Sequence, residues 1–411
     1  MVDIQLEGMT ISVQIVCGIE QVKKSPLPPY SELVCEFLDE YASMLRKDAE
    51  ARRYPDVQTF AFWARKSNIQ KKKIEFKKRT QSVNYLGRGI VFHVAPSNVP
   101  VNCMFTYAFG LLSGNANIVR IPSKAFPQVE CMCRILKQCL QREEFQQIYE
   151  MTSIVKYEKN KEITDRYSGD CNIRVVWGGD ETIHAIRNSE LSARSIEITF
   201  ADRYSFGIID AKKWKNADVV EKKTIAEGFY NDTYLMDQNA CSTPHLICWD
   251  VDGLTKEEYT SVQVEFWNTI QRVAVKYDLA DIKVSEKYAS LCEEVIENKM
   301  ISKVEKYDNL LYVCDVEVLN QNMVTSLRGK YGLFFQYVLH SIDDIHYFSN
   351  EKVQTCAYFG DKQEELLDHI IRNGFCGIDR IVPFGKALNI DTIWDGYDLV
   401  AQMSRIIEIS K

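Results

Sequence analysis

The chain has 411 residues, a formal net charge of -7 and 46% hydrophobic residues, a composition typical of a globular protein with more than one domain. The negative charge argues against nucleic acid as the main partner. No apolar run approaches the roughly 20 residues that span a bilayer, and the first residues lack the basic start and apolar core of a secretory signal. We therefore expect a cytoplasmic protein without a membrane span. Its 13 cysteines lack metal-type spacing, which indicates a reducing compartment and no metal site.

A basic stretch extends from Arg65 to Arg79 and is interrupted by Glu75. A solvated helix face is the simpler interpretation of this stretch. The alternative is a docking surface for an anionic partner.

The first half of the chain predicts a βαβ unit. Apolar residues at three- and four-residue intervals predict a helical layer over residues 31–73. A β-rich apolar run then predicts a buried strand over residues 90–95, and a loop over residues 96–100 follows it. The spacing next predicts a helix over residues 101–113 and a strand over residues 117–122. This order predicts a parallel sheet whose ligands lie beyond the carboxyl ends of its strands.

Polar or glycine residues follow three of the predicted strands. Ser97 and Asn98 stand between two prolines, and Lys124 follows the next strand. A later strand runs into Gly178 and Gly179, and glycines before a helix let backbone N–H groups approach a phosphate. Loop capping by the asparagine, a solvent-facing lysine and an ordinary glycine turn are the respective alternatives.

The second half continues the alternation with a strand over residues 205–210 and a helix over residues 222–240 that leads to Cys241. Between a polar turn and a predicted strand, this thiol can face a cleft while its own backbone N–H points toward whatever binds the sulfur. The position suits a nucleophile, although a thiol with a pKa near ~8.5 needs a nearby donor to form the reactive thiolate. The alternative is a small buried core residue. Further elements are a helix over residues 257–277, strands over residues 310–313 and 333–338, and a glycine-rich segment over residues 374–385.

Three motifs occur in the order and spacing of the aldehyde dehydrogenase superfamily, which the chain resembles from about residue 85 onward. They are Val-Ala-Pro-Ser-Asn-Val-Pro over residues 94–100, a second motif over residues 114–124, and Asp-Gln-Asn-Ala-Cys over residues 237–241. Within the superfamily, the chain is most similar to LuxC-like reductases of fatty acyl-CoA or acyl-protein thioesters. The C-terminal motifs of those reductases resemble residues 377–388 and 393–399.

The resemblance implies an α/β fold of two interlocked domains, a Rossmann-like cofactor domain and a catalytic cysteine domain. We expect a helical layer and NADP-binding domain over residues 1–204 and the catalytic domain over residues 205–385. A C-terminal segment over residues 386–411 is expected to return to the cofactor domain. The superfamily also implies a homo-oligomer.

The resemblance further implies the chemistry. Cys241 attacks the carbonyl of a fatty acyl-CoA or acyl-carrier thioester, and hydride from a reduced nicotinamide converts the resulting acyl-enzyme to an aldehyde. The side-chain amide of Asn98 and the backbone N–H of Cys241 are the donors to the oxyanion, and loss of one such donor costs ~10²–10³ in rate. The implied partners are an acyl carrier protein or an acyl-protein synthetase, for which the basic stretch is a candidate surface.

The charge after the second strand predicts the cofactor. Lys124, with Arg120 nearby, stands where NAD-preferring relatives often carry glutamate. A carboxylate repels a 2′-phosphate and cations attract it, so we expect NADPH. Ser97, Gly178 and Gly179 are the further expected cofactor-binding residues.

One departure from the superfamily bears on the reaction. Hydrolytic members have a water-activating glutamate where this chain has Thr199. Its loss suits a reductase, because activated water would release the acyl group as free acid. Glu197, two residues away, keeps a hydrolytic aldehyde dehydrogenase open as an alternative. A non-catalytic scaffold that binds an acyl carrier is the second alternative.

Overall fold

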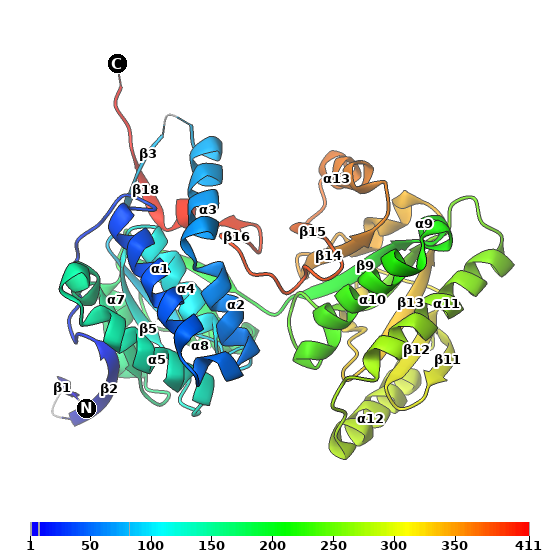
Figure 1. Cartoon of the computed structure of the whole chain (residues 1–411), viewed down its shortest axis with the longest axis horizontal. Helices are drawn as coiled ribbons and strands as arrows, with labels where there is room; N and C mark the ends of the chain where they lie inside the picture. The colour runs from blue at the N-terminus through cyan, green and yellow to red at the C-terminus, as the bar shows by residue number, and fades with distance from the viewer. Residues whose placement is uncertain (1, 7–8, 82, 411) are drawn as a thin grey trace. The chain divides into compact units, whose positions relative to one another are not determined.

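The computed structural model describes residues 2–6, 9–81 and 83–410, and it divides the chain into two compact units (Figure 1). The first unit comprises Met1–Ala201 and Tyr397–Lys411, and the second unit comprises Asp202–Gly396. The chain therefore passes between the units twice. Each unit is an α/β structure built on a largely parallel sheet, which confirms the predicted fold class.

A seven-stranded sheet in the order β1-β2-β6-β5-β4-β7-β8 forms the centre of the first unit. The strands are β1 (Val2–Leu6), β2 (Met9–Gly18), β4 (Ile90–Val94), β5 (Ala116–Arg120), β6 (Thr152–Lys156), β7 (Ile173–Trp177) and β8 (Ile196–Phe200). Strands β4 to β8 run parallel to one another. The chain moves outward from β4 through β5 and β6 and then continues on the other side of β4 with β7. Open parallel sheets bind ligands beyond the carboxyl ends of the strands at such a reversal.

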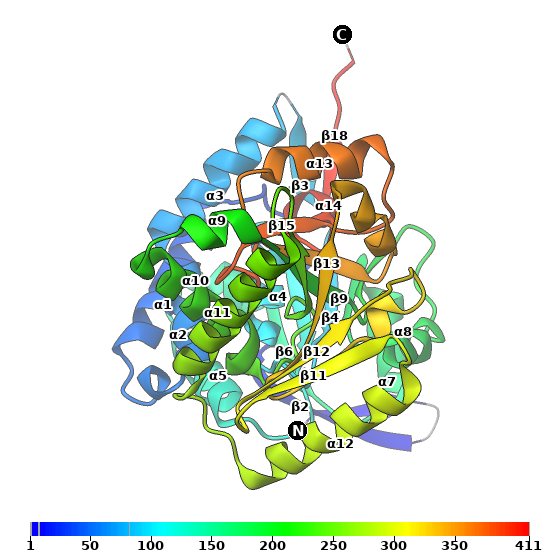
Figure 2. The ribbon, with the colours of Figure 1, turned by 90° about the vertical axis from the view of Figure 1, so that its right-hand side faces the viewer.

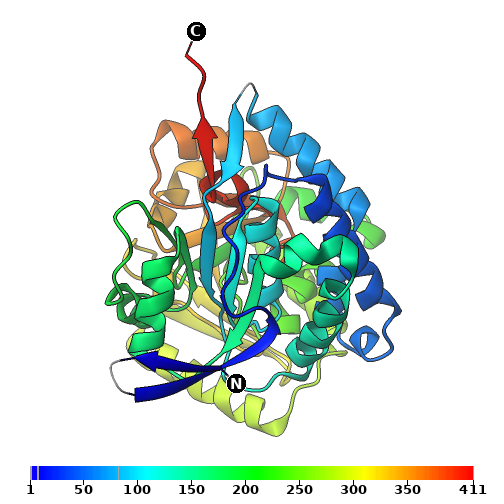
Figure 3. The ribbon, with the colours of Figure 1, turned by 90° about the vertical axis from the view of Figure 1, so that its left-hand side faces the viewer.

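Helices cover both faces of this sheet (Figure 3). Because side chains alternate along a strand, Phe92 and Val94 of β4 pack with α7 and α8, whereas His93 contacts Thr106 of α4. The predicted helical layer is present as α1, α2 and α3, of which α1 packs against α4 and α5. The helices are α1 (Glu32–Lys47), α2 (Pro55–Trp63), α3 (Lys66–Arg79), α4 (Asn102–Leu112), α5 (Pro127–Leu140), α6 (Gln146–Glu150), α7 (Lys161–Asp170), α8 (Asp180–Arg187) and α14 (Leu399–Gln402).

A second seven-stranded sheet, in the order β11-β12-β13-β10-β9-β14-β15, forms the centre of the second unit. Its strands are β9 (Tyr204–Asp210), β10 (Pro244–Asp250), β11 (Ile301–Tyr307), β12 (Leu311–Val316), β13 (Leu333–Leu339), β14 (Val353–Phe359) and β15 (Arg380–Pro383). All of them are parallel except β11. Three residues, 201–203, connect β8 of the first sheet to β9 of the second.

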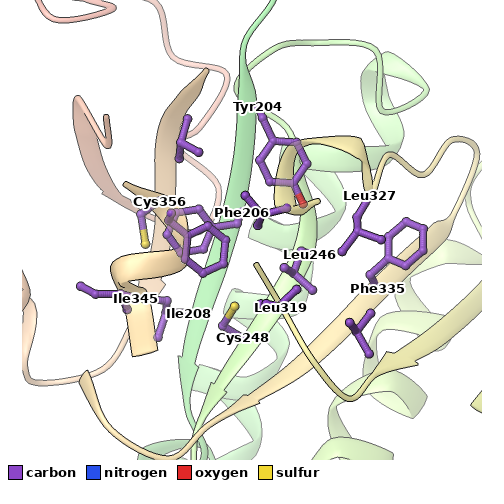
Figure 4. Close-up of a cluster of buried hydrophobic side chains, with 14 of the residues drawn as sticks. Tyr204, Phe206, Ile208, Leu246, Cys248, Leu319, Leu327, Phe335, Ile345 and Cys356 are labelled. Carbon is purple, nitrogen blue, oxygen red and sulfur yellow. The ribbon is translucent and has the colours of Figure 1, made fainter. Parts of the chain in front are cut away.

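Each face of the second sheet has its own apolar core. Phe206 and Ile208 of β9 lie beside Leu246 and Cys248 of β10 on one face (Figure 4), which α13 (Gln363–Arg372) also covers. On the other face, α9 (Ala211–Asn216), α10 (Val219–Thr233) and α11 (Lys256–Ala274) pack with the alternate side chains, and α10 lies along α11 (Figure 2). No helix in the described parts of the chain is long and apolar enough to cross a membrane.

The helix expected over residues 222–240 is shorter than predicted. α10 ends at Thr233, a single 3₁₀ turn follows, and Asp237 and Gln238 adopt left-handed backbone angles, with φ of 53° and 60°. The side chain of Gln238 accepts a hydrogen bond from the backbone N–H of Gly332 at 2.6 Å and donates one to the carbonyl of Leu333 at 3.0 Å. This distant contact stabilises a turn where helical spacing alone predicts continuation.

The segment expected to return to the first domain divides at Tyr397. Strand β18 (Ser404–Ile407) pairs antiparallel with β3 (Asn84–Gly87) in the first unit. Residues 386–396 stay in the second unit, where the Arg380 guanidinium donates to the carbonyls of Ala387 and Asn389. The C-terminal residues are therefore shared between the two units.

Gly228 of α10 provides a test of this packing. A Cβ at this position would lie 2.8 Å from the backbone carbonyl carbon of Phe384, so the neighbouring segment would have to shift. We predict that Gly228→Ala lowers the free energy of unfolding by about 1–3 kcal/mol, measured by urea denaturation. Gly169→Ala in α7 is the matched control, because nothing lies within 4 Å of the added Cβ. It should raise stability by about 0.5–1 kcal/mol, and equal effects of the two changes would contradict the close contact.

Candidate active site

Three loops open from one edge of the first sheet. The register pairs Val94 of β4 with Arg120 of β5 and with Val176 of β7, so the three strands end at the same level. The loop after β4 carries Ser97 and Asn98, the loop after β5 carries Lys124, and β7 is followed by Gly178 and Gly179. The structure thus brings all the predicted first-half residues to the edge where the strand order reverses.

Asn98 has no structural role that would explain its position. Its side chain is exposed, and no hydrogen bond within the described residues engages it. Helix α4 begins after Val101 and has no side-chain cap, so loop capping is not the role of this asparagine. The amide is available to a bound molecule.

The cations of this edge differ in their surroundings. The Arg120 guanidinium lies 4.5 Å from the centre of the Tyr157 ring and is partly covered by it. Lys124 is exposed, and residues 121–126 around it include no acidic side chain. A Cβ on Gly179 would meet nothing within 4 Å, whereas the backbone N–H of Gly178 already donates to the carbonyl of Phe200 at 3.2 Å. Lys124 Nζ lies 5.5 Å from the centre of the Phe126 ring and has no acidic partner in its loop. An exposed cation, an open backbone approach and a polar loop fit a phosphorylated nucleotide.

A buried network of hydrogen bonds links the strands and the helix that carry these loops. The His93 ring contacts the Thr106 hydroxyl at 2.7 Å and the Asn117 side-chain oxygen at 2.9 Å, and the Trp177 indole donates to Thr106 at 3.2 Å. Burial lowers the pKa of His93 to about 4, so the ring is neutral at physiological pH. The network joins β4, α4, β5 and β7 and holds their loops in register.

Cys241 lies in the second unit, in the turn that precedes β10. Of the 13 cysteines, all in the described ranges and all free thiols, ten are buried, Cys292 and Cys376 are exposed, and Cys241 is intermediate. The Ser205 hydroxyl donates to the carbonyl of Cys241 at 2.8 Å. The backbone N–H of Cys241 faces its own sulfur and finds no acceptor in the described residues. A bound carbonyl oxygen could therefore accept from this N–H.

Charged and polar groups from separate elements surround the thiol. The Gln354 side-chain nitrogen lies 3.7 Å from the sulfur and 2.8 Å from a carboxylate oxygen of Asp395, which pairs with Arg203 at 2.7 Å. Burial, and then the Asp395 charge, raise the pKa of the Cys241 thiol, whereas Gln354 and Arg203 act to lower that pKa. Arg380 of β15 also faces this site. The thiolate is thus disfavoured by burial and supported by specific donors.

Sequence reasoning missed the importance of Gln354, Asp395, Arg203 and Arg380. Asp395 and Arg380 stood in segments noted only for their resemblance to a family, and Gln354 was not singled out. A glutamine next to a threonine inside the buried run of β14 is the one local signal, because fully buried strands are usually apolar.

Glu197 is not free to act as a general base. One of its oxygens accepts from Arg174 at 2.8 Å, and the other accepts from Arg187 at 2.7 Å. Both oxygens are therefore occupied by guanidinium donors within the first unit.

The basic stretch forms α3. Lys73 pairs with Glu32 at 2.6 Å, and Lys72 is buried beside the Trp63 ring at 5.6 Å. Lys77 and Lys78 are exposed in the last turn. Part of the stretch is thus structural, and the remainder is a cationic surface open to an anionic partner.

The Gln238 contacts generate a prediction about the position of Cys241. Gln238→Ala removes two buried hydrogen bonds, so it should lower the free energy of unfolding by about 1–3 kcal/mol. It should also slow modification of Cys241 by a thiol reagent, because the released turn would no longer hold the thiol beside its donor Gln354. Asn239→Ala is the control, because Asn239 is exposed and its side chain makes no hydrogen bond to the described residues. Unfolding by urea and peptide mapping of alkylated cysteines measure the two effects. An unchanged alkylation rate in Gln238→Ala would show that these two hydrogen bonds do not position the thiol.

Comparisons with known proteins agree with this architecture. A family model described as acyl-CoA reductase (LuxC) matches residues 67–406. No curated protein sequence matches the chain. Lactaldehyde dehydrogenase from Escherichia coli is 10% identical over 91% of this chain and 85% of that one, with a TM-score of 0.59. A mutant 1-pyrroline-5-carboxylate dehydrogenase from Thermus thermophilus is 11% identical over 92% and 80%, with a TM-score of 0.61. Glyceraldehyde-3-phosphate dehydrogenase from Methanocaldococcus jannaschii, in complex with NADP, is 16% identical over 92% and 86%, with a TM-score of 0.53.

Proposed function

Because the chain belongs to the acyl-CoA reductase (LuxC) family, we propose that it reduces a fatty acyl thioester to an aldehyde with NADPH, through an acyl group carried on Cys241. The observation that supports this proposal is the environment of the thiol. Cys241 as a residue has intermediate exposure at the sheet edge, its backbone N–H lacks an acceptor in the described residues, and the Gln354 amide nitrogen lies 3.7 Å from the sulfur. A partly exposed cysteine whose thiol has fixed donors is a common setting for a nucleophile.

In the first step the Cys241 thiolate attacks the carbonyl carbon of the thioester. The new C–S bond replaces the bond to the carrier sulfur, which leaves as a thiolate and takes up a proton. The oxyanion needs donors. The backbone N–H of Cys241 is one candidate, and the family resemblance makes the side-chain amide of Asn98 the other. The Ser205 hydroxyl holds the Cys241 carbonyl at 2.8 Å, which keeps the local backbone fixed while the bond forms.

A reduced nicotinamide, when bound, supplies a hydride to the acyl carbon. The same two donors then stabilise the oxyanion on Cys241. When that oxyanion becomes the aldehyde carbonyl, the C–S bond breaks and Cys241 is released as a thiolate. The chain uses its sulfur twice, first as a nucleophile and then as a leaving group.

We assign the nucleotide to the edge of the first sheet between β4 and β7. Lys124 is the exposed cation there, and it can pair with a 2′-phosphate because no carboxylate stands in its loop. Gly178 and Gly179 let the backbone approach the cofactor, and Ser97 offers a hydroxyl on the neighbouring loop. Arg120, partly covered by Tyr157, supports the loop and adds positive charge.

Lys124 generates a prediction about cofactor choice. Lys124→Glu should raise the KM for NADPH about tenfold or more, because it replaces a charge-assisted contact with repulsion. The KM for NADH, which lacks the 2′-phosphate, should change much less. Lys137→Glu on α5 makes the same charge change at an exposed site outside the edge and should leave both constants unchanged. Steady-state kinetics with each nucleotide measure the effect, and equal losses with both nucleotides would exclude a 2′-phosphate contact.

Two alternatives make different products. A hydrolytic aldehyde dehydrogenase would release free acid, which requires a base that activates water. The engagement of Glu197 by two arginines argues against this alternative. A scaffold would bind an acyl carrier, for which α3 offers exposed Lys77 and Lys78, without turning it over.

The decisive assay combines the purified protein with a long-chain acyl-CoA and NADPH. We expect loss of the nicotinamide absorbance and formation of aldehyde, abolished by Cys241→Ala. Asn98→Ala should slow turnover by about 10²–10³ if it removes an oxyanion donor. Asn188→Ala, at the exposed end of α8, is its control.

Each other outcome selects a different interpretation. Free acid would favour the hydrolytic alternative. A stable acyl group on Cys241 without nicotinamide consumption would support the thioester as acyl donor and would contradict NADPH as the hydride donor. Absence of both reactions with acyl-CoA and with acyl carrier protein would favour the scaffold. A lower KM for the acyl carrier protein than for acyl-CoA would identify a protein as the natural donor.

A further inference from the structure

We propose that Gln354 is a catalytic hydrogen-bond donor to the Cys241 thiolate, and that Asp395 and Arg203 are the residues that position it. This inference deepens the proposed function, since it concerns how the nucleophile is prepared. Asp395 lies in the segment 393–399 that carries part of the family resemblance, but sequence reasoning assigned no role to it, to Gln354 or to Arg203.

The orientation of the Gln354 amide follows from its partners. Asp395 is a carboxylate and can only accept, so the group that faces it at 2.8 Å must be the NH₂ of Gln354. The amide oxygen accepts from the Thr355 hydroxyl at 3.2 Å on the other side. One N–H therefore bonds to Asp395, and the second is free to point at the sulfur, 3.7 Å from the same nitrogen.

Asp395 is buried and has an unusual backbone conformation. It is 5% exposed and has a left-handed φ of 54°, a conformation that costs a non-glycine residue about 1 kcal/mol or more. Arg203 pairs with Asp395 at 2.7 Å, contacts Asp379 through a second, short ion pair, and donates to the carbonyl of Val353 at 3.0 Å. Because Val353 precedes Gln354, one guanidinium fixes both the carboxylate and the strand that bears the glutamine.

Besides burial, four groups from separate elements act on the charge at the sulfur. Gln354 comes from β14, Asp395 from the segment before the second crossing between the units, Arg203 from the residues before β9, and Arg380 from β15. Gln354 and the two arginines favour the thiolate, whereas the negative charge of Asp395 disfavours it. Removal of the glutamine donor and removal of the aspartate charge must therefore change thiol reactivity in opposite directions.

The test measures the rate at which iodoacetamide alkylates Cys241, as a function of pH, by mass spectrometry of its peptide. Only the thiolate reacts. Gln354→Met keeps the length of the side chain but lacks the N–H, so the midpoint of the rate profile should move to higher pH. The rate at pH 7.5 should fall about three- to tenfold, which corresponds to a pKa change of up to about one unit. Asp395→Asn keeps an acceptor for Gln354 but removes the charge, so the midpoint should move to lower pH and the rate should rise by a similar factor.

Other cysteines in the same samples provide the controls. Exposed Cys292 should react equally in all variants, and buried Cys248 should stay unmodified while the fold is intact. If Cys248 becomes reactive in Gln354→Met, the fold of that variant is disturbed. The proposal is then tested by Asp395→Asn, in which the midpoint of the rate profile should move to lower pH. Midpoints that stay constant, or that move in the same direction in both variants, would overturn the proposal. Alkylation needs neither thioester nor nicotinamide, so a failure of the reductase assay with the opposite shifts present would reject only the proposed function.

Discussion

Two hydrogen bonds, one accepted and one donated by the side chain of Gln238, hold the turn that carries Cys241, and the chemistry proposed for this chain depends on them. They stop α10 and turn the backbone through two left-handed residues. Cys241 is thereby placed at the amino edge of the second sheet, where Ser205 of β9 and Gln354 of β14 can reach it. A helix that continued to Ala240 would carry the thiol away from both strands. The site thus depends on the end of a helix as much as on the residues that line it.

Much of the fold follows from local pattern. Apolar spacing predicts the strands β4, β5 and β7 and the helix α4 within a few residues, because each buries a continuous face against its neighbours. The loops after those strands could be placed at one edge for the same reason, since parallel strands end on the same side. The thiol of Cys241 could be singled out because small polar residues precede it and a buried strand follows.

The remainder of the site depends on long-range contacts. Gln354 is 113 residues from Cys241 in the sequence, and its partner Asp395 is 41 residues further along. Only the order of the strands β10, β9, β14 and β15 brings these residues together, and no local spacing encodes that order. The end of α10 was mispredicted for the same reason, because the loop that binds Gln238 lies 94 residues away. Charge pairs such as Glu197 with Arg174 likewise become visible only when neighbouring strands are known.

The second crossing of the chain between the units has a consequence for biosynthesis. Leu399, Val400 and Met403 are buried in the first unit, the carbonyl of Met403 accepts from the Asn115 side chain, and β18 supplies the partner strand of β3. A ribosome makes these residues last. The second unit, residues 202–396, is therefore fully synthesised while the first unit still lacks part of its core. The first unit is therefore begun first and completed last. The unit boundaries at residues 201 and 397 mean that some 200 residues of intervening chain are synthesised before the C-terminal strand of the first unit is available.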